Sequence, residues 1–319
     1  MAHGAQKAQQ DHGKHGGHAH GGHGGHGHGG PGHAHGGHGH GGDEFDWAAM
    51  ADLLEAEGET HAPYVRQAIA DLAGLVEPRR ILDIGSGPGV AACRFAAAFP
   101  AAEVTAVDAT PELLARAAER AERFEVRLAT RQAEFPAGLA ELGPADLVWS
   151  AQAVHHLGDQ QDALNRLAAL LAPGGVLAVV EGGLPGRWLP RDLGFGRPGL
   201  AARMDLAQEE RFARMRAELP DSVAVVEDWP AMLRAAGLTG AHSRSYLVDL
   251  PAPLDPVARR WVRGTVERYR AVLDGELAGE DLAMLDRLLD PTDPAGLDRR
   301  PDLFVLTAKT VHIARRPAD

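Results

Sequence analysis

The chain has 319 residues, of which 45% are hydrophobic, so it can bury a substantial core and is expected to be globular. Its formal net charge of -12 argues against a nucleic-acid backbone as the main partner, because such binding depends on clustered Lys and Arg. The single cysteine, Cys93, excludes an intrachain disulfide and a multi-cysteine metal site. No apolar run reaches the ~18 residues of a membrane span, and the N-terminus lacks a signal-peptide core. We therefore expect a cytoplasmic protein that neither spans a membrane nor binds nucleic acid.

Residues 1–42 consist mainly of Gly and His and hold twelve of the seventeen histidines. This composition cannot bury enough apolar surface to offset the entropy of ordering, so we predict a disordered tail. Imidazoles at this density chelate divalent Zn, Ni or Cu in changing combinations. A divalent metal is therefore a candidate partner of the tail, although no fixed ligand set and no catalytic metal are predicted. An expression tag is the alternative origin, but the irregular glycine spacing favours a native tail.

Residues 43–78 are predicted to form N-terminal helices. Apolar residues at helical spacing indicate a first helix around residues 45–54 and a second over residues 65–76. Pro78 ends the second helix, because proline has no backbone N–H to continue the hydrogen-bond ladder.

Residues 80–89 read as a buried strand followed by a glycine-rich turn. The apolar residues Ile81, Leu82 and Ile84 are typical of a strand covered on both faces, and glycines follow at 85, 87 and 89. Glycine allows a sharp turn and a close approach of the backbone to a ligand. A helix opening near Val90 directs unpaired N–H groups into the same space. The sequence therefore predicts a cradle for a nucleotide-like ligand.

Helices and strands then alternate regularly. We predict helices at 90–99, 111–123 and 160–171, and strands at 103–107, 124–128, 146–149 and 176–180. This alternation indicates an α/β fold, a doubly wound parallel sheet with helices on both faces. Ligands of such sheets bind at the carboxyl ends of the strands, so the first strand is expected at the centre of the sheet.

After Glu181 the alternation breaks. Two segments, at about 182–228 and 251–300, are predicted to be largely helical insertions, and strands at 243–250 and 303–313 are predicted to close the sheet. Insertions of this kind commonly determine specificity.

The glycine loop alone does not identify the ligand. Gly87, Gly89 and Ala92 also fit the dinucleotide fingerprint, and Asp108 lies about 20 residues downstream, where a ribose-binding acid is expected. Asp83 distinguishes the two possibilities, because a carboxylate repels a pyrophosphate but attracts a ligand with ammonium and sulfonium centres.

Residues 83–89, Asp-Ile-Gly-Ser-Gly-Pro-Gly, closely resemble the first motif of the class I S-adenosylmethionine-dependent methyltransferases of small-molecule type. The resemblance continues through Asp108, 130–134, 146–157, 171–175 and Glu181. It implies a seven-stranded, mostly parallel, Rossmann-like methyltransferase domain over residues 79–319. It also implies that residues 43–78 cap the cofactor and that the insertions form an acceptor lid. His61, Tyr64 and Arg66 are then candidates to face the site, with ordinary core or surface positions as the favoured alternative.

The resemblance further implies individual site residues. Asp108 is expected to bind the ribose hydroxyls, with a helix cap as its alternative role. Gln132 stands where the family usually has an Asp that binds the adenine amino group, and the Ala133 amide is expected to donate to the ring. The full set of expected cofactor residues is Asp83, Gly85, Ser86, Gly87, Gly89, Asp108, Ala109, Gln132, Ala133 and Ala151.

His155 is the candidate general base, because an imidazole titrates near neutral pH. A structural role in capping or packing is its alternative, and His156 and Glu181 are weaker candidates. Arginines of the first insertion are expected either to steer a carboxylate-bearing acceptor or to lie on a solvated lid: Arg187, Arg191, Arg197 and Arg203.

The predicted function is transfer of a methyl group from S-adenosylmethionine to a small-molecule acceptor by in-line displacement. Two alternatives remain at this point. One is an NAD(P)-dependent oxidoreductase, which the overlapping glycine fingerprint supports. The other is a metal-buffering protein that acts through its His-rich tail.

Overall fold

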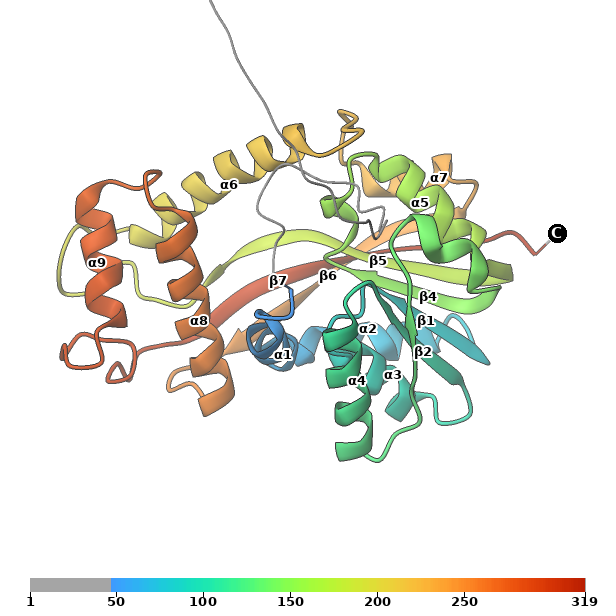
Figure 1. The fold of residues 1–319 in the computed structure, drawn as a ribbon, viewed down its shortest axis with the longest axis horizontal. Coiled ribbons are helices and arrows are strands. Elements are labelled where there is room, and N and C mark those ends of the chain that lie inside the picture. The colour runs from blue at the N-terminus through green and yellow to red at the C-terminus, as the bar shows by residue number, and fades with distance from the viewer. Residues whose placement is uncertain (1–46, 319) are drawn as a thin grey trace, which may run out of the picture. The chain divides into compact units, whose positions relative to one another are not determined.

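The computed structural model describes residues 47–318, all of which belong to one compact unit, so the predicted tail lies outside the described residues. The strands are β1 Arg80–Ile84, β2 Glu103–Asp108, β3 Ala129–Gln132, β4 Ala145–Ala151, β5 Leu171–Arg187, β6 Thr239–Leu250 and β7 Val305–Arg315. They form a seven-stranded sheet in the order β3-β2-β1-β4-β5-β7-β6 (Figure 1). Only β7 runs antiparallel to its neighbours, which confirms the doubly wound, mostly parallel Rossmann-like fold.

Helices cover both faces of the sheet. They are α1 Ala51–Thr60, α2 Ala62–Ala73, α3 Val90–Ala98, α4 Pro111–Arg123, α5 Gln160–Ala169, α6 Leu200–Glu218, α7 Trp229–Ala235, α8 Pro256–Val272 and α9 Gly279–Leu289, with 3-10 turns η1 Ala137–Glu141 and η2 Val154–His156. Helices α2, α3 and α4 pack against one face, and α5 and α7 against the other (Figure 1).

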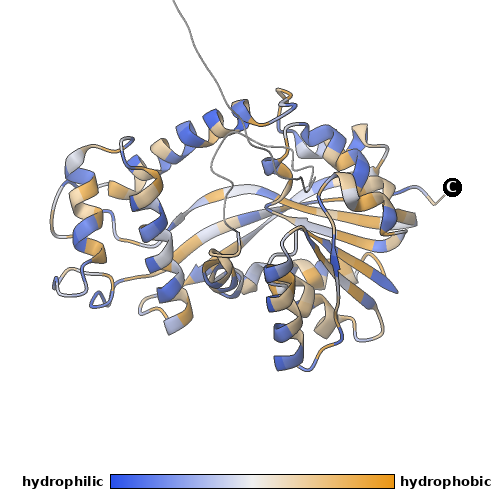
Figure 2. Cartoon of the chain, in the orientation of Figure 1, coloured by the Kyte–Doolittle hydropathy of each residue, from blue (hydrophilic) through white to orange (hydrophobic). Residues whose placement is uncertain are grey.

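The core divides into two clusters because successive side chains of a strand point to opposite faces. In β1, Ile81 packs in the cluster that contains α2 and α3, whereas Leu82 and Ile84 pack in the cluster that contains α5 and α7. All three side chains are fully buried. Figure 2 shows the resulting hydrophobic central strands. Burial on both faces explains why Ile81, Leu82 and Ile84 are all apolar, which is the pattern from which this strand was predicted.

The topological switch point lies between β1 and β4. From β1 the chain builds outward through β2 and β3, and it then returns to add β4 on the other side of β1. Such a reversal opens a crevice at the carboxyl ends of the two strands. The prediction that β1 is the central strand was wrong, because the antiparallel pair β7 and β6 extends the far edge and makes β4 the middle strand.

The third strand was predicted at 124–128 but is found at Ala129–Gln132. Phe124 caps the end of α4 instead, and its exposed ring lies 4.8 Å from the Arg120 guanidinium carbon. Val126 and Leu128 are partly buried and pack against the core without entering the sheet. The true strand is an exposed edge, so it needs no apolar side chains and carries little sequence signal.

The insertions are attached to the half of the sheet that is formed by the long strands β5, β6 and β7. Strand β5 continues to Arg187 and pairs with β7 beyond the parallel region. Helix α6 follows β5, and α8 and α9 lie between β6 and β7. Helix α8 packs against α1, so the insertions and the N-terminal helices meet beside the carboxyl ends of the strands (Figure 1).

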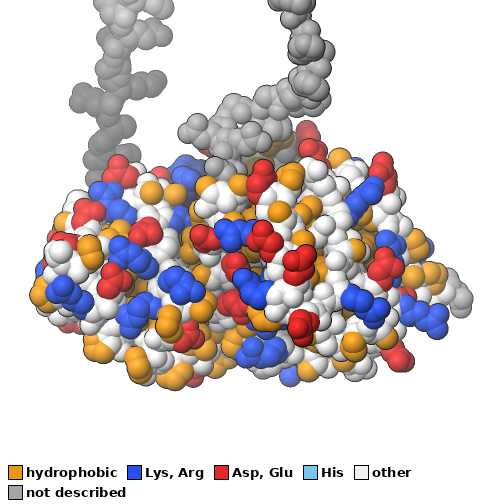
Figure 3. Space-filling model, turned by 60° about the horizontal axis from the view of Figure 1, so that its bottom comes forward, with side chains coloured by type: hydrophobic (Ala, Val, Ile, Leu, Met, Phe, Trp, Pro, Cys, Tyr) orange, Lys and Arg blue, Asp and Glu red, His pale blue; other side chains and the backbone are white. Residues whose placement is uncertain are grey.

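Ion pairs hold α1 in place against the sheet domain. The side chain of Arg120 in α4 is 3% exposed and pairs with Glu55 and Glu59 of α1, and Arg94 of α3 also pairs with Glu59. Removing one partner of a buried ion pair is strongly destabilising, so α1 is a fixed part of the fold. Figure 3 shows one face of the molecule, on which cationic and anionic side chains are interspersed without a large patch of one sign.

Candidate active site

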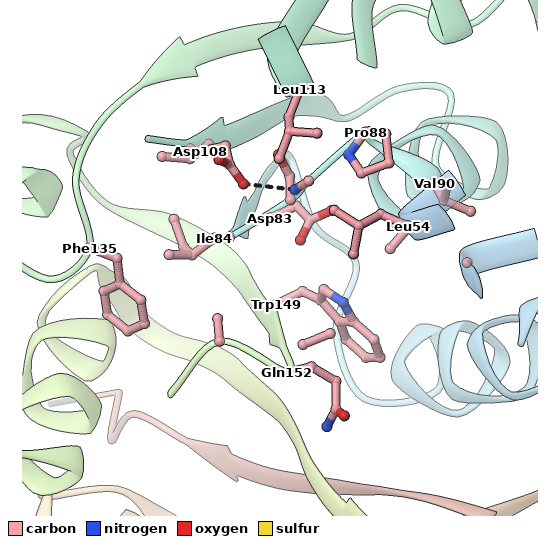
Figure 4. A pocket seen from close by; sticks show the side chains of 18 of the residues that line it. Leu54, Asp83, Ile84, Pro88, Val90, Asp108, Leu113, Phe135, Trp149 and Gln152 are labelled. Carbon is pink, nitrogen blue, oxygen red and sulfur yellow. Dashed lines mark hydrogen bonds between the residues drawn. The ribbon is translucent and has the colours of Figure 1, made fainter. Parts of the chain in front are cut away.

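A cavity of about 350 Å³ lies at the carboxyl ends of β1, β2 and β4 (Figure 4). The glycine loop, the loops after β2 and β4, helices α1 and α2, and one residue of β7 line it. Its polar lining includes Glu57, His61, Tyr64, Asp83, Ser86, Asp108, Thr110, Gln152, His156 and Lys309.

Asp108 ends β2 and faces the glycine loop. One carboxylate oxygen accepts the Gly87 N–H at 2.8 Å, shown by the dashed line in Figure 4, and the other accepts the Thr110 N–H at 2.9 Å. Each oxygen keeps a further acceptor lone pair, as recognition of a diol requires. Asp108 thus orders two loops while remaining available to a ligand.

Gly87 and Gly89 serve different physical purposes. Both have left-handed backbones, with φ of 53° and 73°. A Cβ on Gly87 would meet no atom within 4 Å, so it would fill open space in the cradle. A Cβ on Gly89 would lie 2.6 Å from the Ala117 Cβ. Gly89 therefore allows α3 to begin close against α4, and it does not line the cavity.

Asp83 is a buried carboxylate beside the same loop. It is 2% exposed, and its Oδ2 atom has no hydrogen-bond partner among the described residues. Burial, followed by repulsion from Asp108, raises the pKa of the Asp83 carboxyl to about 7, partly offset by the Ala92 N–H. Ser86 Oγ and Trp149 Nε1 are also buried without partners. Unpartnered polar atoms along one wall fit a ligand that supplies a positive charge and hydrogen bonds.

Most of the predicted cofactor residues line this cavity: Asp83, Gly85, Ser86, Gly87, Asp108, Ala109, Ala133 and Ala151. Gln132 does not, because its exposed side chain donates to the Ala109 carbonyl. The Ala133 N–H donates to the Asp108 carbonyl, so it is already engaged and not directed at a ligand as expected. Phe135 lies beside Ala133 and supplies an aromatic wall that the sequence did not indicate (Figure 4).

His155, the predicted base, is not among the residues that line the cavity. Its Nδ1 atom is 2.8 Å from a carboxylate oxygen of Glu181 at 3% side-chain exposure, and the other Glu181 oxygen accepts the Val154 N–H at 2.9 Å. The exposed neighbour His156 lines the cavity. Glu181 therefore connects β5 to the turn after β4 and holds the His155 ring in place.

Comparison with known proteins gives concordant results. Residues 81–175 match the model of a methyltransferase domain family. A trans-aconitate 2-methyltransferase from Methylobacterium nodulans is 32% identical over 277 residues, which cover 83% of this chain and 99% of that protein. The corresponding protein of Methylobacterium radiotolerans is 33% identical over 74% of this chain and 88% of its own length. The chain belongs to the class I S-adenosylmethionine-dependent methyltransferases.

Solved structures are also among the matches. A phosphoethanolamine N-methyltransferase of Haemonchus contortus in complex with S-adenosyl-L-methionine is 15% identical, with a TM-score of 0.44, over 86% of this chain and 61% of that chain. The YcgJ protein from Bacillus subtilis is 19% identical, with a TM-score of 0.45, over 80% and 99% of the two chains.

The methyltransferase uses S-adenosylmethionine to methylate a small molecule. The comparisons support neither the oxidoreductase alternative nor the metal-buffering one. Within residues 47–318, no group of three or more His, Cys, Asp or Glu is arranged to hold a metal ion. Among the same residues, no helix has the length and apolar character that crossing a membrane requires.

Residues from outside the Rossmann-like motifs complete the cavity of the methyltransferase. Of the three N-terminal residues that were candidates to face the site, His61 and Tyr64 line it, whereas Arg66 is exposed. Lys309 of β7 also lines it, more than 200 residues after the glycine loop in the chain. One sequence signal does exist for Lys309, because lysine occurs only at positions 7, 14 and 309.

The insertion arginines do not line the cavity. Arg187 pairs with Asp205 at 2.6 Å, and Arg203 pairs with Asp281 at 2.6 Å. Arg197 pairs with both Glu280 and Asp281. For Arg187, Arg197 and Arg203 the structure favours a role outside the site, because their charges join the α6 segment to α9 and to the end of β5. Arg191 is exposed.

Proposed function

We propose that the methyltransferase holds S-adenosylmethionine across the carboxyl ends of β1, β2 and β4. The observation that best supports this proposal is that Asp83 and Asp108 lie on either side of the glycine loop and line the same cavity. When bound, S-adenosylmethionine supplies an electrophilic methyl group on a sulfonium. Asp108 is assigned to the ribose hydroxyls. The open side of Gly87 is assigned to close contact with the body of the cofactor. Asp83 is assigned to the ammonium end, because its charge is otherwise unbalanced in a buried site.

The acceptor is proposed to be a small carboxylic acid. Two relatives with 32 and 33% identity are trans-aconitate 2-methyltransferases, and Lys309 provides a cationic group in the cavity. A carboxylate oxygen attacks the methyl carbon as the carbon–sulfur bond breaks, which forms an ester. The cavity walls contribute mainly by aligning the two groups and excluding water, an effect that reaches about 7–11 kcal/mol in well-oriented systems.

His155 is proposed as a base only for an acceptor that loses a proton, such as a hydroxyl compound. A carboxylate acceptor is already ionised near neutral pH and needs no base. His155→Ala should then lower turnover on a hydroxyl acceptor about 100-fold or more, while the affinity for S-adenosylhomocysteine stays unchanged. The measurement is steady-state kinetics together with calorimetry. Equal turnover by the variant and the wild type would assign His155 to positioning the β4–α5 turn.

The proposed cofactor site is tested by calorimetric titration of metal-free protein with S-adenosylhomocysteine, and with reduced nicotinamide dinucleotide in parallel. We expect saturable binding of the first ligand and none of the second. Binding of the nicotinamide ligand alone would overturn the assignment of Asp83. A positive result justifies screening of di- and tricarboxylic acids as acceptors.

We also propose that the protein works in the cytoplasm. Its single cysteine, Cys93, is free and buried, which suits a reducing compartment. Divalent metal binding by residues 1–42 is proposed as a separate property of the tail. It is supported by the histidine content of that segment alone.

A further inference from the structure

We propose that Lys309 anchors a carboxylate of the acceptor that is not itself methylated, so that the enzyme selects acceptors with an anionic group separate from the attacking atom. This inference rests on the proposed cofactor site and on methyl transfer to a small acid. It adds a specificity-determining residue and a constraint on the chemical form of the acceptor.

Lys309 is a cation without an anionic partner in the described part of the chain. Its Nζ atom lies 3.5 Å from the Gln152 side-chain oxygen, a weak contact, and no carboxylate of residues 47–318 forms an ion pair with it. It is also the only Lys or Arg among the described residues that line the cavity. A partly buried ammonium is desolvated at a cost unless a counter-charge arrives. An anionic ligand group supplies that counter-charge.

The Gln152 side chain is held with its oxygen toward the Lys309 ammonium. Its backbone is left-handed, with φ of 55°, which is unfavourable for a residue other than glycine and often marks a functional site. Its backbone N–H and its side-chain Nε2 both donate to the Val180 carbonyl, at 2.9 and 3.2 Å. The side-chain amide is thereby oriented with its oxygen toward Lys309. Gln152 also follows Ala151, which ends β4 in the proposed cofactor wall.

The neighbouring His61 does not add a second positive charge. Its Nδ1 donates to the Glu57 carbonyl at 2.8 Å, which fixes the proton on that nitrogen. Burial and the charge of Lys309 lower the pKa of His61 to about 4, so its ring is neutral near pH 7. The second ring nitrogen remains an acceptor. Glu57 also lines the cavity, and its charge acts on His61 in the opposite sense to that of Lys309. Lys309 is therefore the one cation among the described lining residues that can anchor a carboxylate.

The reaction itself separates the anchored group from the attacking one. As the methyl group moves, the sulfonium loses its positive charge and an attacking carboxylate loses its negative charge. An ammonium against the attacking oxygen would stabilise the reactants more than the transition state and slow the transfer. Lys309 favours the reaction only if it binds a different anionic group, whose charge does not change.

The strand order also places Lys309 away from Asp83 and Asp108, the two acids beside the glycine loop. Strand β7 lies three strand positions from β1, about 14 Å at the usual interstrand spacing. An acceptor with a carboxylate at one end is repelled by Asp83 and Asp108 and attracted by Lys309. The cavity thus directs the anionic end toward β7 and leaves the rest of the acceptor toward β4.

The test is calorimetric binding of propane-1,2,3-tricarboxylate to the full chain saturated with S-adenosylhomocysteine, which has no methyl group to transfer. Lys309→Met should weaken this binding at least 10-fold and leave the affinity for S-adenosylhomocysteine within 2-fold of wild type. Lys309→Arg should retain most of the binding. The matched control is Arg260→Met in α8, an exposed cation that does not line the cavity; it removes the same charge and should change nothing.

The outcomes distinguish failure of the proposed cofactor site from failure of the Lys309 proposal. If the wild type does not bind S-adenosylhomocysteine, the proposed cofactor site fails, and the Lys309 proposal fails with it. If S-adenosylhomocysteine binds normally but the tricarboxylate binds wild type and Lys309→Met equally, or does not bind wild type, only the Lys309 proposal is overturned. The neutral triamide of the same skeleton should not distinguish wild type from Lys309→Met. With a methylated acid as substrate, Lys309→Met should raise KM far more than it lowers kcat.

Discussion

At the scale of single residues, Asp83, which is proposed to bind the ammonium end of the cofactor, lowers the stability of the ligand-free fold when it is charged. Its carboxylate is buried with one unpartnered oxygen, and its pKa is raised to about 7. Because this pKa lies above the ordinary value of 3.8, the folded protein binds the proton more tightly than the unfolded chain does. The contribution of Asp83 to stability is therefore fully present below about pH 4 and is lost as the pH rises through about 7.

We therefore expect Asp83→Asn to stabilise the ligand-free protein at pH 8, by on the order of 2 kcal/mol, and to have little effect at pH 5. The same variant should bind S-adenosylhomocysteine at least 10-fold more weakly at pH 8, because the ligand's ammonium loses its partner. Differential scanning calorimetry at both pH values and a binding titration at pH 8 check this. A variant that is less stable than wild type at pH 8 would contradict the assigned ionisation.

At the scale of elements, the glycine loop and the start of α3 form one unit with two separable roles. Gly87 and Gly89 have the same backbone handedness, but only Gly89 is pressed against another helix, at Ala117. Helix α3 must start this close to α4 for its first turn to lie under the cradle. Substituting each glycine in turn therefore separates the effect of space for the ligand from the effect of helix packing.

Gly89→Ala should destabilise the fold by about 2–5 kcal/mol, since it combines left-handed strain with a steric clash. Gly87→Ala should cost only about 1–2 kcal/mol of stability but should weaken S-adenosylhomocysteine binding strongly, because its Cβ occupies the open side of the cradle. Thermal unfolding and calorimetric titration of both variants provide the measurement. Equal binding losses at equal stability would show that Gly87 has no special relation to the ligand.

At the scale of the whole molecule, the parallel half of the sheet and the long antiparallel half contribute different groups to the cavity. The parallel half supplies Asp83 and Asp108, and the antiparallel half supplies Lys309 and carries α8 and α9. Helix α1 joins them, because it pairs with Arg120 of α4 and packs on α8. The residues proposed to recognise the cofactor and the acceptor thus lie on elements from distant parts of the chain.

The His-rich segment is predicted to be independent of this machinery. Deletion of residues 1–42 should leave S-adenosylhomocysteine affinity within 2-fold of the full chain and should remove most Ni or Zn binding, since the five histidines outside the tail are scattered along the sequence. Parallel titrations of the two proteins with ligand and metal check both statements. A large loss of ligand affinity on deletion would give the segment a part in the active site.

The sequence alone was sufficient to predict the parallel half of the fold, apart from the position of β3 and the full length of β5. The alternation of apolar runs and helical spacing predicted α4 at its observed bounds and β1, β2 and β4 within a few residues. The two acids and the glycine loop could be found because their roles depend on short spacings along the chain and on the ends of buried strands. β3 was misplaced because an exposed edge strand needs no apolar pattern.

Only the tertiary structure decided which of these residues line the cavity and which distant residues line it with them. Gly89 and Gln132 fit the motif in sequence, yet Gly89 packs against α4, and the Gln132 side chain donates to the Ala109 carbonyl in the loop after β2. Lys309 reaches the cavity because β7 pairs with β5 far from β1 in the chain, a long-range pairing that local patterns do not encode. Spacing along the chain determined the motif that identifies the cofactor, whereas packing between distant segments determined the surface proposed to bind the acceptor.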